Sequence, residues 1–131
     1  MSYWTNVSGL IRVDSLRFGE PSKSDKEHII KVLGEIYRFG DEYKDTILPC
    51  GSEGSLQYEL LGGENEHAAV YVIPIWGDLR DYGEDMDKIQ YIEDWFNNAC
   101  SQLDIRQATI TIEGGCLDAP KTIVFGKNNT L

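Results

Sequence analysis

Cysteine is scarce in this sequence, and long apolar runs are missing. The three cysteines, Cys50, Cys100 and Cys116, are odd in number and form no Cys-x-x-Cys pair, so they support neither a disulfide framework nor a zinc knuckle. No apolar run approaches the roughly 20 residues that cross a bilayer, and the N-terminus lacks the basic-then-apolar pattern of a secretion signal. We therefore expect free thiols, no membrane partner and a cytoplasmic location.

Basic residues are scarce in the middle of the chain. Residues 41–94 hold three Lys and Arg against fourteen Asp and Glu, whereas residues 1–40 hold six against five and residues 95–131 hold three against three. The middle therefore accounts for the net charge of −10. Because an acidic surface repels nucleic-acid phosphates, we expect no direct nucleic-acid binding and a preference for basic partners. The alternative is that these acids serve solubility alone.

The strongest helical pattern lies in residues 86–103, behind a turn-rich acidic segment at residues 77–83. Apolar residues recur there at steps of three and four, which predicts one buried stripe: Met86, Ile89, Ile92, Phe96, Ala99 and Leu103. Glu84 or Asp85 can cap the first turn. The opposite, solvated face carries Asp87, Gln90, Tyr91 and Asp94.

The other segments alternate between strand and helix patterns. Residues 3–13 alternate as a half-buried strand, with Gly9 at a bulge or close backbone approach. Ser24 and Glu27 form a capping box for a first helix that Gly40 ends. Further strands are predicted at residues 55–61, 68–76, 105–113 and 121–125, the first two joined as a hairpin by a turn at residues 62–66.

The order of these elements predicts the fold class. It is βαββαβ with an extra C-terminal strand, which is typical of an α+β ferredoxin-like sandwich with an antiparallel sheet and two helices on one face. We expect a single domain over residues 1–131, with residues 126–131 frayed. This architecture hosts enzymes, RNA binders and interaction modules alike, so it does not decide the function.

A resemblance adds a biological setting. The opening Tyr3-Trp4-Thr5-x-Val7-x-Gly9-x-Ile11-x-Val13, the helix after it and the Gly51-Ser52-Glu53-Gly54 turn resemble small uncharacterised proteins encoded by phages and prophages. The similarity covers about half of the chain. It implies an accessory protein that acts on host machinery, including defence systems such as CRISPR, by binding.

Sites for chemistry are weakly indicated. Gly51-Ser52-Glu53-Gly54 could offer backbone N–H groups to an anion, but a phosphate loop requires a Lys and a following helix, so a plain turn is the favoured interpretation. Cys50 with His28 or His67 could form a nucleophilic pair, although no local signature supports one. The acids between Asp78 and Asp87 lack the spacing of a calcium loop. We expect no catalytic residue, no metal and no cofactor.

Two functions from different classes remain. In the first, the protein binds and inhibits or modulates a basic host protein through an acidic, aromatic-containing surface made of Asp78, Asp81, Tyr82, Glu84, Asp87, Tyr91 and Asp94. In the second, a small enzyme or a module for a small ligand or nucleotide has a pocket made by Gly51, Ser52, Glu53, Gly54 and Trp76. A homodimer is compatible with either function.

Overall fold

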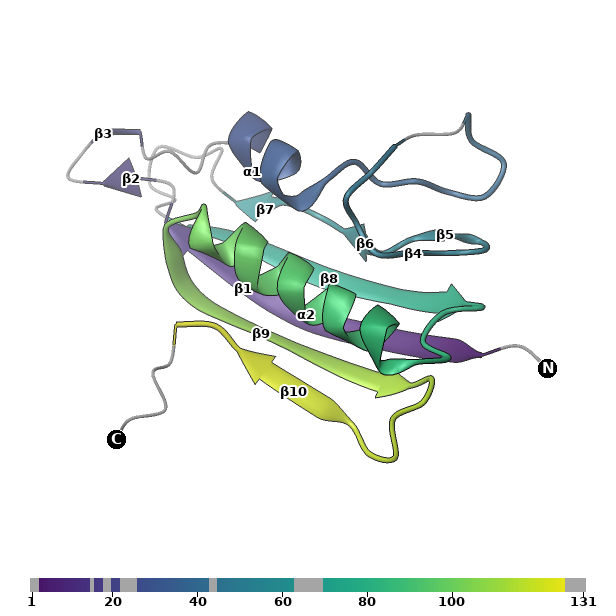
Figure 1. Cartoon of the computed structure of the whole chain (residues 1–131). Helices are drawn as coiled ribbons and strands as arrows, with labels where there is room; N and C mark the ends of the chain where they lie inside the picture. Colours follow the sequence, from purple (N-terminus) through teal and green to yellow (C-terminus); the bar gives the residue numbers. More distant parts are fainter. Residues whose placement is uncertain are drawn as a thin grey trace.

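The computed structural model of the chain describes residues 3–14, 16–17, 20–21, 26–42, 45–62 and 70–126. These residues form one large antiparallel sheet with two helices, as well as two small two-stranded sheets (Figure 1). The capping residue Ser24, the turn residues 63–66, His67 and the tail residues 127–131 lie outside the described residues, so the predictions that concern them stay predictions.

Three long strands make the centre of the large sheet. They are β1 (Trp4–Asp14), β8 (Val70–Arg80) and β9 (Ile105–Gly114), and β1 lies between the other two. β10 (Lys121–Val124) pairs with β9 on one side, and β6 (Gln57–Tyr58) and β7 (Leu61–Gly62) pair with β8 on the other. The small sheets are β2 (Leu16–Arg17) with β3 (Glu20–Pro21), and β4 (Cys50–Gly51) with β5 (Gly54–Ser55).

Both helices bury apolar residues against the large sheet. α2 (Met86–Ser101) packs across one face of it, and α1 (Lys26–Leu33) contacts α2 (Figure 1). The Trp95 indole N–H donates to the carbonyl of Leu33 at 2.9 Å, which joins the two helices. The single core between helices and sheet includes Ile11, Ile29, Ile73, Phe96 and Ile110, each fully buried.

The predicted ferredoxin-like βαββαβ sandwich is wrong. The described residues form a mostly antiparallel β structure with a six-stranded sheet, two further small sheets and only two helices. The main cause lies in residues 50–62, where the sequence predicts one full strand after a connection. This segment instead bends through four two-residue strands. The predicted strand is interrupted at Leu56 and at residues 59–60. The backbone N–H groups of Ser55 and Leu56 donate to the carbonyls of Tyr37 and Pro49 and not to β8, because buried backbone groups must find partners wherever the packing places them.

The first helix and the acidic lead-in also differ from prediction. α1 ends at Leu33, seven residues before Gly40, because Gly34 adopts a φ of +104° and so takes the position that commonly ends a helix. The segment predicted to be turn-rich from residue 77 continues β8 as far as Arg80, where it pairs with β1. The chain turns at Asp81, which has a φ of +57°.

The predicted stripe of α2 is confirmed apart from its first member. Ile89, Ile92, Phe96 and Ala99 are buried, and Leu103 packs against the core from just beyond the helix. Met86 is 50% exposed, because it is the first residue of the helix and lies beyond the edge of the packed face. Asp85 is the N-cap, and its carboxylate accepts a hydrogen bond from the backbone N–H of Lys88 at 3.1 Å.

Both helices of the described part of the chain lie on one face of the sheet, and neither packs on the other face (Figure 1). The alternation predicted for residues 3–13 is confirmed, since Thr5, Val7, Ile11 and Val13 are buried under the helices. The intervening side chains of β1 and those in register with them point to the other side, which we call the open face. Its members on β1, β8, β9 and β10 are Trp4, Asn6, Ser8, Leu10, Arg12, Asp14, Val70, Val72, Pro74, Trp76, Asp78, Arg80, Gln107, Thr109, Thr111, Glu113, Thr122 and Val124.

Candidate functional site

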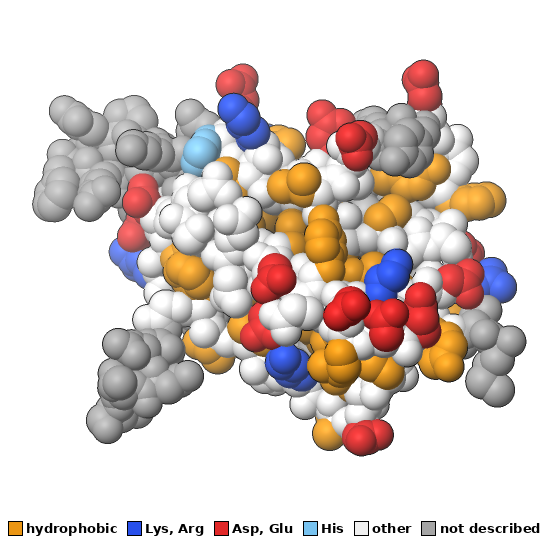
Figure 2. Space-filling model, in the orientation of Figure 1, with side chains coloured by type: hydrophobic (Ala, Val, Ile, Leu, Met, Phe, Trp, Pro, Cys, Tyr) orange, Lys and Arg blue, Asp and Glu red, His pale blue; other side chains and the backbone are white. Residues whose placement is uncertain are grey.

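A cavity of about 580 Å³ lies between the N-terminal half of α2 and the segment that leads into β4. We call it the acidic groove. Its lining combines carboxylates, phenol rings, an aliphatic side chain and a thiol, contributed by Thr46, Leu48, Cys50, Tyr82, Asp85, Asp87, Lys88 and Tyr91. Figure 2 shows acidic side chains gathered over this half of α2, with a basic side chain among them. The groove is therefore both acidic and aromatic.

Hydrogen bonds hold the two walls of the groove in place. The Tyr91 hydroxyl donates to the carbonyl of Ile47 at 2.6 Å and so ties α2 to the segment before β4. The Tyr82 hydroxyl donates to the carbonyl of Lys88 at 2.9 Å. Behind it, the Thr5 hydroxyl donates to the carbonyl of Tyr82 at 2.6 Å, which anchors this wall to β1. The groove is thus built on fixed elements.

A cation of the chain itself already lies against an aromatic ring of the groove. The ammonium of Lys88 is 5.1 Å from the centroid of the Tyr82 ring, within the range of a cation–π interaction. Asp85 and Asp87 line the same cavity. Burial raises the pKa of Tyr82, and the neighbouring Tyr91, Glu84 and Asp85 raise it further, so its phenol stays neutral. The ring can hold a cation by its face.

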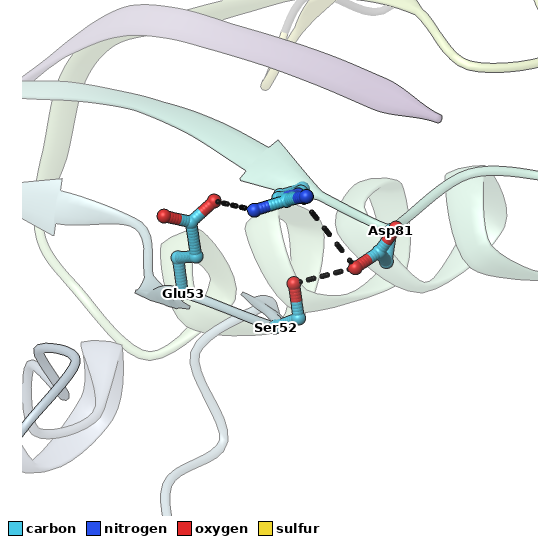
Figure 3. A network of polar contacts seen from close by, with 4 residues as sticks. Ser52, Glu53 and Asp81 are labelled. Carbon is cyan, nitrogen blue, oxygen red and sulfur yellow. Dashed lines mark hydrogen bonds and ion pairs between the residues drawn. The ribbon is translucent and has the colours of Figure 1, made fainter. Parts of the chain in front are cut away.

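The Gly51 to Gly54 turn packs against the end of β8. The Ser52 hydroxyl donates to the Asp81 carboxylate at 2.7 Å, and the Glu53 carboxylate accepts from the Arg80 guanidinium at 3.1 Å (Figure 3). The backbone N–H of Ser52 donates to the carbonyl of Arg80 at 2.9 Å. A Cβ on Gly51 would lie 2.6 Å from that same carbonyl oxygen, so a glycine is required there. These contacts serve to attach the turn to the strand.

The residues predicted to form the partner-binding surface fall into separate places. Glu84, Asp87, Tyr91 and Asp94 are exposed on or just before α2, and the last three share one helical side at steps of four and three. Asp81 lies at the turn with Ser52. Asp78 belongs to the open face, across the sheet from α2, and Tyr82 is 4% exposed, so it contributes a wall and not a protruding anchor.

The predicted ligand pocket is not assembled as expected. Trp76 pairs with Ser8 and Gln57 across the sheet and is 45% exposed on the open face, whereas the Gly51 to Gly54 turn contacts Arg80 and Asp81. Alternation along β8 separates Trp76 from the acidic groove, which is on the helix side. The structure therefore does not bring Trp76 and the turn residues together around one cavity.

The Cys50 and His28 pair is not formed. The Cys50 thiol donates to the carbonyl of Gly51 at 3.4 Å near the start of α2, and a ring nitrogen of His28 is 3.0 Å from the carbonyl of Gln102 at the other end of that helix. Burial also raises the pKa of Cys50, which disfavours the thiolate that a nucleophile needs.

Sequence reasoning missed two parts of the groove. Thr46 and Leu48 lie in residues 41–54, whose polar, glycine-containing sequence predicts only a connection, and Lys88 is a single base among acids. The apolar stretch Ile47-Leu48-Pro49 within a polar segment was the available signal, since Leu48 and Pro49 are both buried. The approach of this stretch to α2 depends on tertiary packing and has no local pattern.

Among the residues described, no group of three or more His, Cys, Asp and Glu side chains is arranged to hold a metal ion. The described helices include none that is long and apolar enough to span a membrane. Comparison of the chain with protein-family models, with curated proteins and with solved structures finds no match.

Proposed function

We propose that the protein binds a partner protein and that its acidic groove receives a basic side chain of that partner. The carboxylates of Asp85 and Asp87 attract the positive charge of that side chain. The rings of Tyr82 and Tyr91 contact its aliphatic stem and, for an arginine, the face of its guanidinium. The net charge of −10 draws basic partners towards the molecule before contact. Asp94, one helical turn after Tyr91 on the exposed side of α2, extends the contact beyond the cavity.

The observation that carries this proposal is the position of Lys88. Lys88 lines the cavity and its ammonium lies 5.1 Å from the Tyr82 ring centroid, so the Tyr82 ring in this wall already contacts a primary ammonium group. Lys88 is exposed and its stem is flexible, which allows an incoming arginine or lysine to displace it at low cost. An arginine stacks on an aromatic ring and pairs with a carboxylate at once, so it is the favoured residue.

The setting of this activity follows from the resemblance to phage and prophage proteins. We propose that the partner is a basic protein of the host cytoplasm, such as a defence or nucleic-acid-processing factor, and that the acidic groove competes for a surface that holds nucleic acid. Inhibition follows because occupation of that surface excludes phosphate. We propose anti-CRISPR proteins as one class to which a protein with this mode of action would belong.

The alternative of a small-ligand or nucleotide site at the Gly51 to Gly54 turn receives no specific support. Ser52 and Glu53 already bond to Asp81 and Arg80, and the carboxylates of Glu53 and Asp81 at the turn disfavour a phosphate. A thermal-shift screen of nucleotides tests it directly. A nucleotide that raised the melting temperature, and lost this effect on Ser52→Ala, would restore that alternative.

The experiment for the groove uses an oligo-arginine peptide as the probe and an oligo-citrulline peptide of equal length as its neutral counterpart. Titration calorimetry at several salt concentrations should show binding of the arginine peptide that weakens as salt rises. Asp87→Lys with Asp94→Lys should weaken that binding by about tenfold or more and flatten its salt dependence. Lys88→Gln should strengthen it, because the internal competitor is removed.

Two control variants distinguish the effect of the groove residues on binding from the effect of net charge. Glu27→Lys with Asp118→Lys changes the net charge equally at exposed positions on α1 and in the loop before β10, and Lys31→Gln matches Lys88→Gln. Both should bind the peptide almost as the original chain does. Equal weakening by the two double variants, or unchanged affinity on Lys88→Gln, would show that the acidic side of α2 is only a solvated surface.

A further inference from the structure

We infer that the open face of the large sheet is a homodimer interface, in which two copies pack face to face with β1 antiparallel to β1 of the second copy. This face lies on the side of the sheet opposite the acidic groove and carries a different chemistry. The inference is independent of the proposed function, because it uses none of the residues that line the groove.

The centre of the open face is uncharged and combines apolar side chains with the hydroxyl groups of Ser8, Thr109 and Thr111. In register order, Leu10 of β1 lies between Pro74 and Thr109, and Ser8 lies between Trp76 and Thr111. Trp76 is 45% exposed and Leu10 is 38% exposed, although both are in the middle of long paired strands. Val72 continues this centre towards Leu61, and Thr109 continues it towards Val124, both of which are 44% exposed.

Charged side chains occupy the ends of the same face. Asp78 and Glu113 flank Asn6 near the start of β1, with Arg80 beside Trp4, whereas Arg12 lies near the end of β1. The Arg80 guanidinium lies 5.9 Å from the Trp4 ring centroid. An uncharged, aromatic centre with a charged rim is the usual composition of a protein interface.

The nearly neutral charge of the open face favours a second copy of this chain as its partner. On β1, β8 and β9, which are described in full, the open-face acids Asp78 and Glu113 are balanced by Arg12 and Arg80, and the ion pair between Arg106 and Asp14 at 2.8 Å adds no net charge. Glu59, opposite Pro74 at the outer edge, is one further acid. A chain of net charge −10 repels its own copy elsewhere, but this nearly neutral face does not.

The two charged ends are also complementary to each other. A two-fold axis in the plane of the interface, at right angles to β1 and level with Gly9, places Arg12 of one copy over Asn6 of the second. Asp78 and Glu113 flank that asparagine, so each arginine meets two carboxylates. The same axis places the Leu10 and Trp76 region of one copy over that of the other. A different protein with a uniformly basic surface would match only the Asp78 and Glu113 end of the face, and one with a uniformly acidic surface would match only the Arg12 end.

The size of the face suits a stable dimer. Strands of eleven residues in five lateral positions define a sheet face of roughly 25 by 35 Å, at about 4.8 Å between strands and 3.4 Å per residue. The short outer strands reduce this footprint to about 700 Å², close to the roughly 800 Å² that each partner buries in a standard interface. Two sheets packed in this way form an aligned β-sandwich.

Sedimentation equilibrium of the full chain over a wide concentration range tests the inference. The original chain should be a dimer at micromolar concentrations. Arg12→Glu should weaken the dimer by about tenfold or more, because it places like charges opposite Asp78 and Glu113 of the second copy. Adding Glu113→Arg to Arg12→Glu should recover most of that loss. Trp76→Ala should weaken the dimer through the loss of an apolar side chain at the centre.

Lys31→Glu makes the same charge change at an exposed position of α1, on the helix side, and should leave the dimer intact. Circular dichroism melting checks that each variant folds, which is expected because all these side chains are at least partly exposed. A monomer at every concentration, equal effects of Arg12→Glu and Lys31→Glu, or no recovery in the double variant would each overturn the proposed dimer.

Discussion

Single residues set the distances between elements in this protein. Gly9 of β1 lies against β9 so closely that an added Cβ would overlap the carbonyl oxygen of Thr109 and lie 2.9 Å from the Cα of Ile110. The close backbone approach expected at Gly9 is therefore confirmed. Backbone atoms cannot shift as a flexible side chain can, so the contact requires a residue without Cβ.

Replacing Gly9 by alanine should destabilise the protein by about 1–3 kcal/mol, the usual cost of overpacking a well-packed site. Equilibrium denaturation in urea measures the change in the free energy of unfolding. Lys31→Ala is the control, because Lys31 is exposed on α1 and lies away from the open face, and it should change that free energy by less than about 0.5 kcal/mol. Equal stability of Gly9→Ala and the original chain would contradict the close approach.

At the scale of elements, α2 connects the core to the acidic groove. One side of it is buried against the sheet, including Ile92 and Phe96 at 0% exposure, while the side that bears Asp87 and Tyr91 is exposed. Its register is fixed at the start by the Asp85 cap and along its length by the Trp95 bond to Leu33. The position of the groove residues therefore depends on core packing one or two residues away.

Truncation of the buried stripe tests this division of the helix. Phe96→Ala and Ile92→Ala should each lower the free energy of unfolding by about 2–5 kcal/mol, because each leaves a cavity under the helix. Met86 also belongs to the predicted stripe but is 50% exposed, so Met86→Ala should lower the free energy of unfolding by less than about 1 kcal/mol. Thermal melting of the three variants provides the comparison, and a Met86 effect as large as that of Phe96 would contradict the assigned face.

Across the whole molecule, charge is distributed unevenly between the two sides of the sheet. Acids concentrate along α2 and the turn before it, where residues 81–94 contain six Asp and Glu against one Lys. The open face of β1, β8 and β9 is nearly balanced. The molecule thus presents one side suited to basic partners and one suited to its own copy, and repulsion among the acids on the first side opposes folding.

Added salt should therefore stabilise the protein. Screening shortens the range of repulsion among the exposed acids, so the melting temperature should rise as sodium chloride increases from about 0.01 M to 0.15 M. Asp94→Asn keeps an oxygen for the hydrogen bond from Gln90 and removes one charge, so its melting temperature should depend less on salt. A melting temperature that fell with salt would show that attractive ion pairs, such as Lys121 with Glu93, dominate instead.

Local periodicity allowed several elements and faces to be predicted. The alternation in residues 3–13 and 105–113, the apolar stripe of α2 and the Asp85 cap each depend on side chains a few residues apart. Burial follows from such patterns because a strand or helix has a fixed geometry. The exposed position of Asp87, Tyr91 and Asp94 was predictable for the same reason.

Tertiary structure decided the fold class and the site. Whether residues 50–62 form one strand or several short ones depends on how they fit beside β8, and the ferredoxin-like prediction failed there. The groove joins Leu48 to Tyr82 and Tyr91, residues that are more than thirty positions apart in the sequence. The open face likewise exists because neither helix packs on it. Contacts between distant segments leave no local period in a sequence, so packing alone determines them.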